Sequence, residues 1–486
     1  MWIALDKNSG ISLKRQLHSH IKEMILGGNI SSGERLPSSR ALSKQLCVSR
    51  NTVLEVYEQL AVEGFLEGER GSGTIVATGI SQQKRTVYKR DRTALSAPFD
   101  TKEETIDFRS GVPDPSLFPQ KEWGKLYGRV CAALPPSAFR YSNFAGVWEL
   151  RESVSRYLFR TRGIECPPQN VMIISGATQG LALIARILSD GKNKAIVEDP
   201  IHSSILNLFS SEGYSVSGIE ADDKGINTFL LPAGADVSFI YTTPSHQYPL
   251  GSILPIQRRQ SLVRYASDND CYVIESDYGN GSTFRFEGPP ISSLHELNPD
   301  RVIYVSSFSK ILTPALRLGF MLLPDKLIPK YKAYKMNADL HSESLSQYVM
   351  AEFINSGRLE KHTSKINKIY NQKRKQLIAE LNAKFPGEFH IKGQTAGLHV
   401  LASFFDTIFT EDLIRRISSC GATVYPVEDF SFQNRGRHCN EIIMGYAHLH
   451  PSEITQGVEI LKRVIHSRAL APRPQYTAPL CRPQFP

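Results

Sequence analysis

The amino-acid sequence predicts two domains: a small helical domain that ends in a β-hairpin, and a large α/β domain built on a parallel sheet. Apolar residues recur at helical spacing in the first 65 residues, and two short strand-like segments follow them. From residue 106 onward, apolar strands alternate with helical patterns for most of the remaining chain. A chain of 486 residues is also too long for one ordinary hydrophobic core.

The composition limits the class of protein. With 41% hydrophobic and 22% charged residues, the chain is typical of soluble globular proteins. No apolar run approaches the ~20 residues of a membrane span, and the N-terminus lacks the basic and apolar regions of a signal peptide. Seven scattered cysteines without a Cys-x-x-Cys pair predict reduced thiols, a cytoplasmic location and no metal site. The net charge of +9 fits a nucleic-acid partner but is only suggestive.

The small domain shows the start and stop signals of three helices. Serines stand at the three expected N-cap positions, Ser12, Ser38 and Ser49. The expected elements are a helix from Leu13 that ends before Gly27, a short helix after Ser38, a helix from Arg50 to about Glu63, and strands at 65–68 and 74–76. This order of elements is that of a winged helix-turn-helix.

The third helix of such a domain enters the major groove with its N-terminal end, whose positive dipole also suits a backbone phosphate. Arginines fall on the turns and helix starts, and Arg70 at the tip of the hairpin would reach an adjacent groove. The alternative is a small protein-interaction module in which these arginines are only surface residues. The predicted DNA-binding residues are Arg35, Arg40, Ser49, Arg50, Asn51, Thr52 and Arg70.

This domain, expected to cover residues 1–78, resembles the GntR-type winged-helix regulators. The matching positions are 33–40, 42–43, 49–53, Tyr57, Leu60, Gly64 and Phe65. The resemblance implies DNA contacts from Arg40, Ser49, Arg50 and Asn51, with the wing turn near Gly71.

Hydrophobic periodicity fades over residues 79–105, which are polar and partly basic and therefore predict a flexible basic linker. Its charge would add non-specific attraction to phosphates, although a merely soluble tether is equally consistent. Five prolines in residues 466–486 predict a disordered tail. The large domain is therefore expected to span residues 106–465.

Five apolar segments of the large domain are predicted strands, at residues 171–174, 195–197, 237–241, 271–274 and 302–305. Ligands of parallel sheets bind beyond the carboxyl ends of the strands, so the residues that follow each strand are informative. The Ser-Gly-Ala-Thr-Gln-Gly turn at 175–180 would offer backbone N–H groups to a phosphate, although packing alone also explains such a turn. His202 would stack on a flat ring or lie on the surface. A polar loop follows the third strand, and Glu275-Ser276-Asp277-Tyr278 ends the fourth.

The fifth strand runs into Ser307, Ser309 and Lys310, and Arg317 follows seven residues later. Burial and nearby cations would lower the pKa of Lys310 and allow a Schiff base with an aldehyde. The two hydroxyls and Arg317 would bind the phosphate of that aldehyde. A solvated lysine is the alternative for an isolated Ser-Lys pair. The five strand ends together provide the groups that a pyridoxal 5'-phosphate (PLP) site needs.

The large domain resembles the fold-type-I aminotransferases. Residues 10–465 are similar to the MocR branch of the GntR-type regulators, in which a winged helix is fused to an aminotransferase-like domain. The matching segments are 110–114, 117–119, Trp123, 141–146, 150–151, 162–164, 175–177, 244–249, 309–310 and 314–319. The predicted fold is therefore an N-terminal winged helix-turn-helix plus an α/β fold-type-I PLP-dependent aminotransferase-like domain.

The resemblance also implies roles for individual residues. Lys310 would be the Schiff-base lysine, and Tyr278 would hydrogen-bond the phenolic oxygen of the cofactor. His202 stands where the family has a stacking aromatic residue. The phosphate would be held by Ala177, Thr178, Ser307, Ser309 and Arg317.

Ser276 departs from the family pattern, which has an aspartate that pairs with the pyridine nitrogen and keeps it protonated. A serine does not favour protonation and so weakens the ring as an electron sink. Losing a charge-assisted bond of ~1.5–3 kcal/mol would cost roughly ten- to a hundredfold in rate. Asp277 or Glu275 would substitute if the strand end were bulged. The arginines that bind amino-acid effectors in the family are also missing, and the nearby Arg435 and Arg437 are out of register.

The sequence therefore predicts a cytoplasmic, homodimeric bacterial transcription regulator that binds operator DNA and PLP. Cofactor occupancy, with or without an amine or amino-acid effector, would change operator affinity. The aminotransferase-like domain is expected to be vestigial, so no catalytic residue is predicted. A regulator that senses the cofactor within vitamin B6 metabolism is a variant of this prediction. The alternatives are an active aminotransferase with an accessory DNA-binding domain, and an interaction protein with an inactive cofactor fold.

Overall fold

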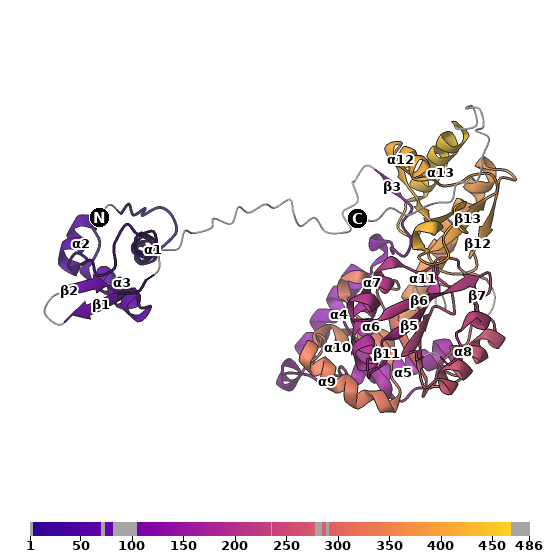
Figure 1. Ribbon diagram of the computed structural model, residues 1–486, viewed down its shortest axis with the longest axis horizontal. Coiled ribbons are helices and arrows are strands. Elements are labelled where there is room, and N and C mark those ends of the chain that lie inside the picture. Colours follow the sequence, from indigo (N-terminus) through magenta and orange to yellow (C-terminus); the bar gives the residue numbers. More distant parts are fainter. Residues whose placement is uncertain are drawn as a thin grey trace. The chain divides into compact units, whose positions relative to one another are not determined.

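The computed structural model of the protein describes residues 3–69, 73–80, 105–234, 236–277, 284–287 and 291–467. The chain forms two compact units, Met1–Asp100 and Thr101–Pro486 (Figure 1). The predicted linker lies outside the described residues except at its two ends, and the predicted tail lies outside them beyond Ser467. Within the described ranges, no helix is both long and apolar enough to cross a membrane.

Three helices and a hairpin make up the first unit. The elements are α1 (Leu13–Leu26), α2 (Ser39–Leu46), α3 (Arg50–Val62), β1 (Leu66–Glu69) and β2 (Gly73–Val76). The hydroxyls of Ser12, Ser38 and Ser49 each accept a backbone N–H from the first turn of the helix that follows. Such caps satisfy N–H groups that have no partner inside the helix. The three predicted helix starts are confirmed.

The core of the first unit forms between the three helices and the hairpin. Leu17 and Ile21 of α1 are fully buried with Leu42 of α2 and Val53 of α3. Cys47, the first residue after α2, adopts a left-handed conformation with φ of 51°. This turn lets α3 follow α2 after only three residues and fixes the angle at which α3 is presented.

The second unit contains the remaining elements. Its α-helices are α4 (Gln120–Ala133), α5 (Trp148–Arg162), α6 (Ala177–Ile187), α7 (Ser203–Ser211), α8 (Ile256–Asp268), α9 (Ile328–Ala338), α10 (Leu345–Asn355), α11 (Arg358–Lys384), α12 (Glu411–Ser419) and α13 (Pro451–His466). Its strands are β3 (Ile106–Asp107), β4 (Val171–Ile174), β5 (Lys194–Asp199), β6 (Ser215–Asp222), β7 (Gly225–Ile226), β8 (Phe239–Thr242), β9 (Tyr272–Ser276), β10 (Val302–Ser307), β11 (Gly319–Leu322), β12 (Phe389–Lys392), β13 (His399–Phe404), β14 (Ala422–Thr423), β15 (Tyr425–Pro426) and β16 (Glu441–Gly445).

An eight-stranded sheet forms the centre of this unit, in the order β4-β11-β10-β9-β8-β5-β6-β7. The run β10-β9-β8-β5-β6 is parallel, whereas β11 is antiparallel to both of its neighbours. The five predicted strands are present, with ends that differ by at most two residues. The sequence analysis did not predict β11, nor β6, whose apolar residues alternate with polar ones.

Helices cover both faces of this sheet, as expected for a parallel α/β fold. Ile303 and Val305 share one core with buried residues of α6, α7 and α9. Tyr304, which points to the opposite face, shares another core with residues of α5, α10 and α11. The alternation along β10 therefore determines which side chains meet α6 and which meet α5 and α11.

A second, four-stranded sheet has the order β12-β13-β16-β15 and is antiparallel. Figure 1 shows this sheet with α12 and α13 at one end of the unit, away from α8 and α9. The carboxyl ends of β5, β8, β9 and β10 carry the loops that the sequence predicted to be functional.

Candidate functional site

Lys310 lies three residues beyond the end of β10. Its amino group donates a hydrogen bond to the backbone carbonyl of Gly111. The residue keeps part of its surface exposed, but protein atoms surround the amino group. Burial, followed by the positive charge of Arg317, lowers the pKa of Lys310 to about 8. A lysine with this pKa is partly neutral at physiological pH and can act as a nucleophile toward an aldehyde.

The turn between β4 and α6 has the geometry of an anion site. Gly176 adopts φ of +89° and precedes Ala177 and Thr178, the first residues of α6. No side chain caps this helix, so the N–H groups of its first turn remain available to a ligand. A Cβ atom at residue 176 would overlap the guanidinium of Arg317. The positive φ therefore favours glycine here, and a larger residue would also have to displace the guanidinium of Arg317.

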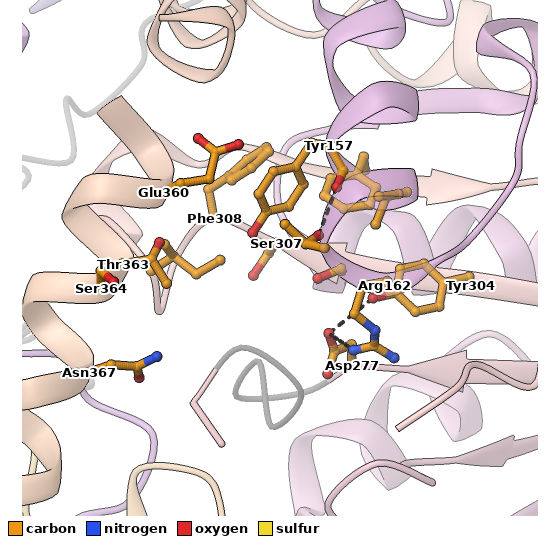
Figure 2. A pocket seen from close by; sticks show the side chains of 15 residues that line it. Tyr157, Arg162, Asp277, Tyr304, Ser307, Phe308, Glu360, Thr363, Ser364 and Asn367 are labelled. Atoms are coloured by element: carbon orange, nitrogen blue, oxygen red, sulfur yellow. Dashed lines mark hydrogen bonds and ion pairs between the residues drawn. The ribbon is translucent and has the colours of Figure 1, made fainter. Parts of the chain in front are cut away.

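Arg317 reaches the same turn from the other side. The residue adopts a left-handed conformation after the 3-10 turn Pro314–Leu316, with φ of 47°. Its Nη2 atom donates to the carbonyl of Ser175 over 2.9 Å. Ser309 is buried next to Lys310 in the chain, and Ser307 is the last residue of β10. The structure thus brings Arg317 to the 175–178 turn, whereas Ser307 lines the cavity beside Tyr157 and Asp277 (Figure 2).

His202 serves as the N-cap of α7. Its Nδ1 atom accepts the backbone N–H of Ser204 over 3.1 Å. The imidazole lies 5.7 Å from the ring of Tyr248 and 5.9 Å from that of Phe430. Burial and the nearby charge of Lys310 lower the pKa of His202, so the ring is neutral at physiological pH. His202 is thus a flat, neutral ring held close to Lys310.

The three acidic or polar residues that end β9 point to different partners. Ser276 is buried in register with Val305 of β10. Glu275 is also buried and accepts hydrogen bonds from the hydroxyl of Ser293 and from the N–H of His295. Asp277 accepts the hydroxyl of Tyr304 over 3.0 Å. Both carboxylates are therefore engaged on the face of the sheet opposite Ile303 and Val305, and β9 shows no bulge that would turn Asp277 around.

A cavity of about 250 Å³ with a mixed polar and apolar lining is found on that opposite face. Arg162 at the end of α5 pairs there with Asp277 over 3.3 Å, and both side chains are buried. Figure 2 shows Glu360, Thr363, Ser364 and Asn367 of α11 across the cavity from Tyr157 and Arg162 of α5. This ion pair holds the Asp277 carboxylate on the cavity side, whereas Ser276 lies on the face of the sheet shared with Val305.

Two further sequence predictions concern Tyr278 and Arg437. Tyr278 lies outside the described residues. Arg437 pairs with Glu220 of β6. A neighbouring carboxylate therefore partly neutralises the charge of Arg437.

Most of the predicted DNA-binding residues are exposed in the structure. Arg35, Arg40, Ser49, Arg50 and Asn51 are exposed, Thr52 is half-buried, and Arg70 lies outside the described residues. The Ser49 hydroxyl caps α3 and lies 2.8 Å from the hydroxyl of Thr52. These two hydroxyls are already engaged with the helix start. Arg50 and Asn51 lie on the first turn of α3 with exposed side chains.

Comparison with known proteins identifies both units. The family model for aminotransferase class I and II matches residues 104–441, and the model for bacterial regulatory proteins of the gntR family matches residues 13–76. The probable rhizopine catabolism regulatory protein MocR of Rhizobium meliloti is 29% identical over 475 residues, which are 95% of each chain. The pyridoxine biosynthesis regulator PdxR of Corynebacterium glutamicum is 30% identical over 399 residues, 82% of this chain and 85% of PdxR. The chain belongs to the MocR-type transcriptional regulators.

The fold of the second unit is that of fold-type-I aminotransferases, as predicted. The crystal structure of an archaeal alanine:glyoxylate aminotransferase superposes with a TM-score of 0.68 and 26% identity, over 75% of this chain and 91% of that one. Members of this fold family bind PLP. The residues of the regulator fit that group, because an uncapped helix start, a glycine cradle, Arg317 and a lysine with a lowered pKa lie at one edge of the sheet.

Sequence reasoning missed several residues that shape the site of the regulator. Glu198, buried at the end of β5, accepts hydrogen bonds from Thr242 and Thr243 and so holds the loop after β8. Lys335 of α9 is fully buried and lies one helical turn after buried Tyr331. A lysine on the apolar face of a helix is a visible signal, but the same spacing is common where a long side chain reaches past the core to solvent.

Proposed function

We propose that this MocR-type regulator binds PLP through Lys310 and that cofactor occupancy changes its affinity for operator DNA. The observation that carries the proposal is the pairing of Lys310, with its pKa near 8, and the uncapped phosphate turn at the start of α6. Gly176, Ala177, Thr178 and Arg317 would hold the phosphate, with Ser307 and Ser309 beside it. The chemistry that the cofactor supplies is an aldehyde that reacts reversibly with amines.

The regulator's own residues perform defined tasks in this site. Lys310 provides the amine, and the carbonyl of Gly111 orients it by accepting a hydrogen bond from it. His202, neutral and capping α7, provides a flat surface against the cofactor ring. Tyr278, expected from the family resemblance, would hydrogen-bond the phenolic oxygen.

Ser276 argues for regulation rather than turnover. With Asp277 paired to Arg162 and Glu275 bonded to Ser293, a serine would face the ring nitrogen. A hydroxyl can hydrogen-bond this nitrogen without keeping it protonated, and protonation is what makes the ring an effective electron sink. We therefore expect a site that binds and senses the cofactor but transaminates slowly.

The DNA-binding part of the proposal assigns operator contacts to Arg35, Arg40, Arg50, Asn51 and Arg70, with Ser49 and Thr52 at the helix start. A two-fold homodimer would present two α3 helices to paired half-sites, and the regulator would act in the cytoplasm. PLP with or without an amine effector would shift the dimer between two arrangements. Such a shift requires that PLP or the effector bind the two arrangements with different affinities. Since the effector arginines are absent from their usual positions, PLP itself is the first ligand to test, and the relative PdxR regulates pyridoxine biosynthesis.

The experiment that tests the proposal is an absorbance titration of the full-length protein with PLP, beside Lys310→Ala and the matched control Lys332→Ala, an exposed lysine of α9. The wild type and the control should acquire a visible absorbance band that Lys310→Ala lacks. An operator selected from a random DNA library should then change affinity with PLP only in the proteins that show the band. A wild type without the band would overturn the cofactor proposal and leave the DNA-binding unit unaffected.

An active aminotransferase is the competing function, favoured by the likeness to working enzymes of the same fold. Steady conversion of an amino acid and an oxo acid by the PLP-loaded protein would support it. Turnover no faster than that of free PLP with the same amino acid would exclude it.

A further inference from the structure

Lys335, in the last turn of α9, has an environment that is unusual for a lysine. The residue is fully buried, and its ammonium group donates to Asp339 over 2.8 Å, to Ser342 over 2.9 Å and to Gln179 over 3.4 Å. An ammonium has three protons to donate, and all three have an acceptor here. Burial lowers the pKa of Lys335 and Asp339 opposes that change.

Gln179 connects this lysine to the turn between β4 and α6. Its Oε1 atom accepts the backbone N–H of Ser175 over 2.7 Å, and its Nε2 atom donates to Asp339 over 2.6 Å. Lys335 and Asp339 therefore fix the amide in one orientation, with the oxygen toward Ser175. In the opposite orientation the amide would present its NH₂ group to the N–H of Ser175 and to the ammonium.

The same turn is held at two further points. Ser342 accepts from Lys335 and donates to the carbonyl of Ile173, the penultimate residue of β4. The carbonyl of Ser175 accepts from Arg317 over 2.9 Å. Both backbone groups of Ser175 are thus engaged, the N–H by Gln179 and the carbonyl by Arg317. Fixing Ser175 fixes the residue that precedes Gly176.

A buried ammonium is costly to desolvate, and an apolar side chain of similar length would fill the space next to Tyr331 at a lower cost. The lysine is therefore poorly explained by core stability alone. What it provides is a rigid polar network directly behind the N–H groups at the start of α6. Preorganised N–H groups bind an anion without an ordering cost at the moment of binding.

We propose that Lys335 is a positioning residue that acts through Gln179 to hold the 175–178 turn in its phosphate-binding shape. The proposal rests on the proposed function, namely that this turn receives the phosphate of PLP. Lys335 itself is separated from the ligand by Gln179 and Ser175. Its effect should therefore be confined to the phosphate of the ligand.

The test compares PLP with pyridoxal, which has the same aldehyde and ring but lacks the phosphate. Both are titrated into full-length wild type, Lys335→Met and the matched control Lys332→Met, on the exposed side of the same helix. Lys335→Met should bind PLP about tenfold more weakly than the wild type. Its affinity for pyridoxal should stay within about twofold, and the control should match the wild type for both ligands.

Each other outcome has a distinct meaning. Equal losses for PLP and pyridoxal would show a general structural role and overturn the inference, as would unchanged PLP affinity. A wild type that binds neither ligand would overturn the proposed function instead. If Lys335→Met does not fold, Asp339→Asn carries the test, because it keeps the shape of a partly exposed side chain and removes the charge that orients Gln179. That variant should lose PLP affinity by about threefold, again without a loss for pyridoxal.

Discussion

The predicted DNA-binding residues of the first unit all fall between residues 35 and 70, whereas Lys310 of the second unit donates to Gly111, 199 residues away in the chain. In the first unit a capping serine and a left-handed Cys47 present α3, so its site depends on local backbone chemistry. In the second unit, loops from several strand ends must meet. Mutations should therefore act locally in one unit and through the packing of distant segments in the other.

The largest expected effect concerns the charge of Lys310, which depends on tertiary burial. Its pKa of about 8, against an ordinary 10.5, makes the neutral amine roughly a hundredfold or more abundant at pH 7 than in an exposed lysine. The rate of band formation with pyridoxal should rise with pH, with a midpoint near pH 8, and level off at higher pH. Arg317→Met should move this midpoint upward, because Arg317 contributes to the lowering. A midpoint near pH 10.5 in the wild type would contradict the burial of the Lys310 amino group.

The lowered pKa of Lys310 also changes how the free energy of unfolding depends on pH. The unfolded chain binds the proton of Lys310 more tightly than the folded chain, so stability at low pH is reduced. This cost disappears as the pH rises from about 8 to 10.5. Denaturant unfolding of the cofactor-free protein should show this rise in the wild type and not in Lys310→Met.

Gly176→Ala should have the next largest effect. Residue 176 needs a positive φ and has no room for a Cβ beside Arg317, so PLP affinity should fall by about a hundredfold. Gly213→Ala is the matched control, because Gly213 has the same φ of +89° with open space around it. Titration of PLP into both variants, followed by the absorbance band, separates the effect of backbone strain from that of the close contact between residue 176 and Arg317. Equal losses of PLP affinity in the two variants would mean that backbone strain alone matters.

Ser276→Asp tests which side chain faces the ring nitrogen. A carboxylate at this position should raise transamination by roughly ten- to a hundredfold, which corresponds to one charge-assisted bond of ~1.5–3 kcal/mol. The readout is single-turnover conversion of an added amino acid, with Ser276→Asn as the uncharged control. If both variants remain as slow as the wild type, residue 276 does not serve the nitrogen.

Arg50→Ala addresses the first unit. Loss of this exposed side chain from the first turn of α3 should weaken operator binding by about tenfold, in keeping with one base or phosphate contact. The PLP band should be unchanged, because the two sites use different parts of the chain. Arg15→Ala, an exposed arginine of α1, is the control in a binding assay at fixed salt. Similar losses from both variants would indicate only general charge attraction.

Ser49→Ala should have the smallest effect, a loss of about 1 kcal/mol in the free energy of unfolding of the first unit. The Ser49 hydroxyl accepts the N–H of Thr52, and alanine leaves that group without its cap. Thermal unfolding followed by circular dichroism measures the change, and Ser49→Asp should restore the stability. An unchanged unfolding temperature in Ser49→Ala would show that the cap is dispensable.

Local signals were sufficient for much of the molecule. The serine caps predicted the starts of all three helices of the first unit, because a hydroxyl at the N-cap acts on N–H groups only three residues away. Short apolar runs predicted five strands of the large sheet, since strands buried on both faces need apolar residues throughout. The motifs also predicted both family relationships. Strand β6, in which polar residues interrupt the apolar ones, carries no such signal.

Tertiary structure alone decided how the residues around the cofactor site are used. The chain reads Glu275-Ser276-Asp277, and only the direction of each side chain shows that Asp277 pairs with Arg162 and Glu275 with Ser293. The role of Lys335 likewise depends on Gln179, 156 residues away. Such hydrogen bonds and ion pairs form between groups that packing brings together. The separation of two residues along the chain does not show whether they form one. The sequence determined which chemical groups are present, and the fold determined which of them meet.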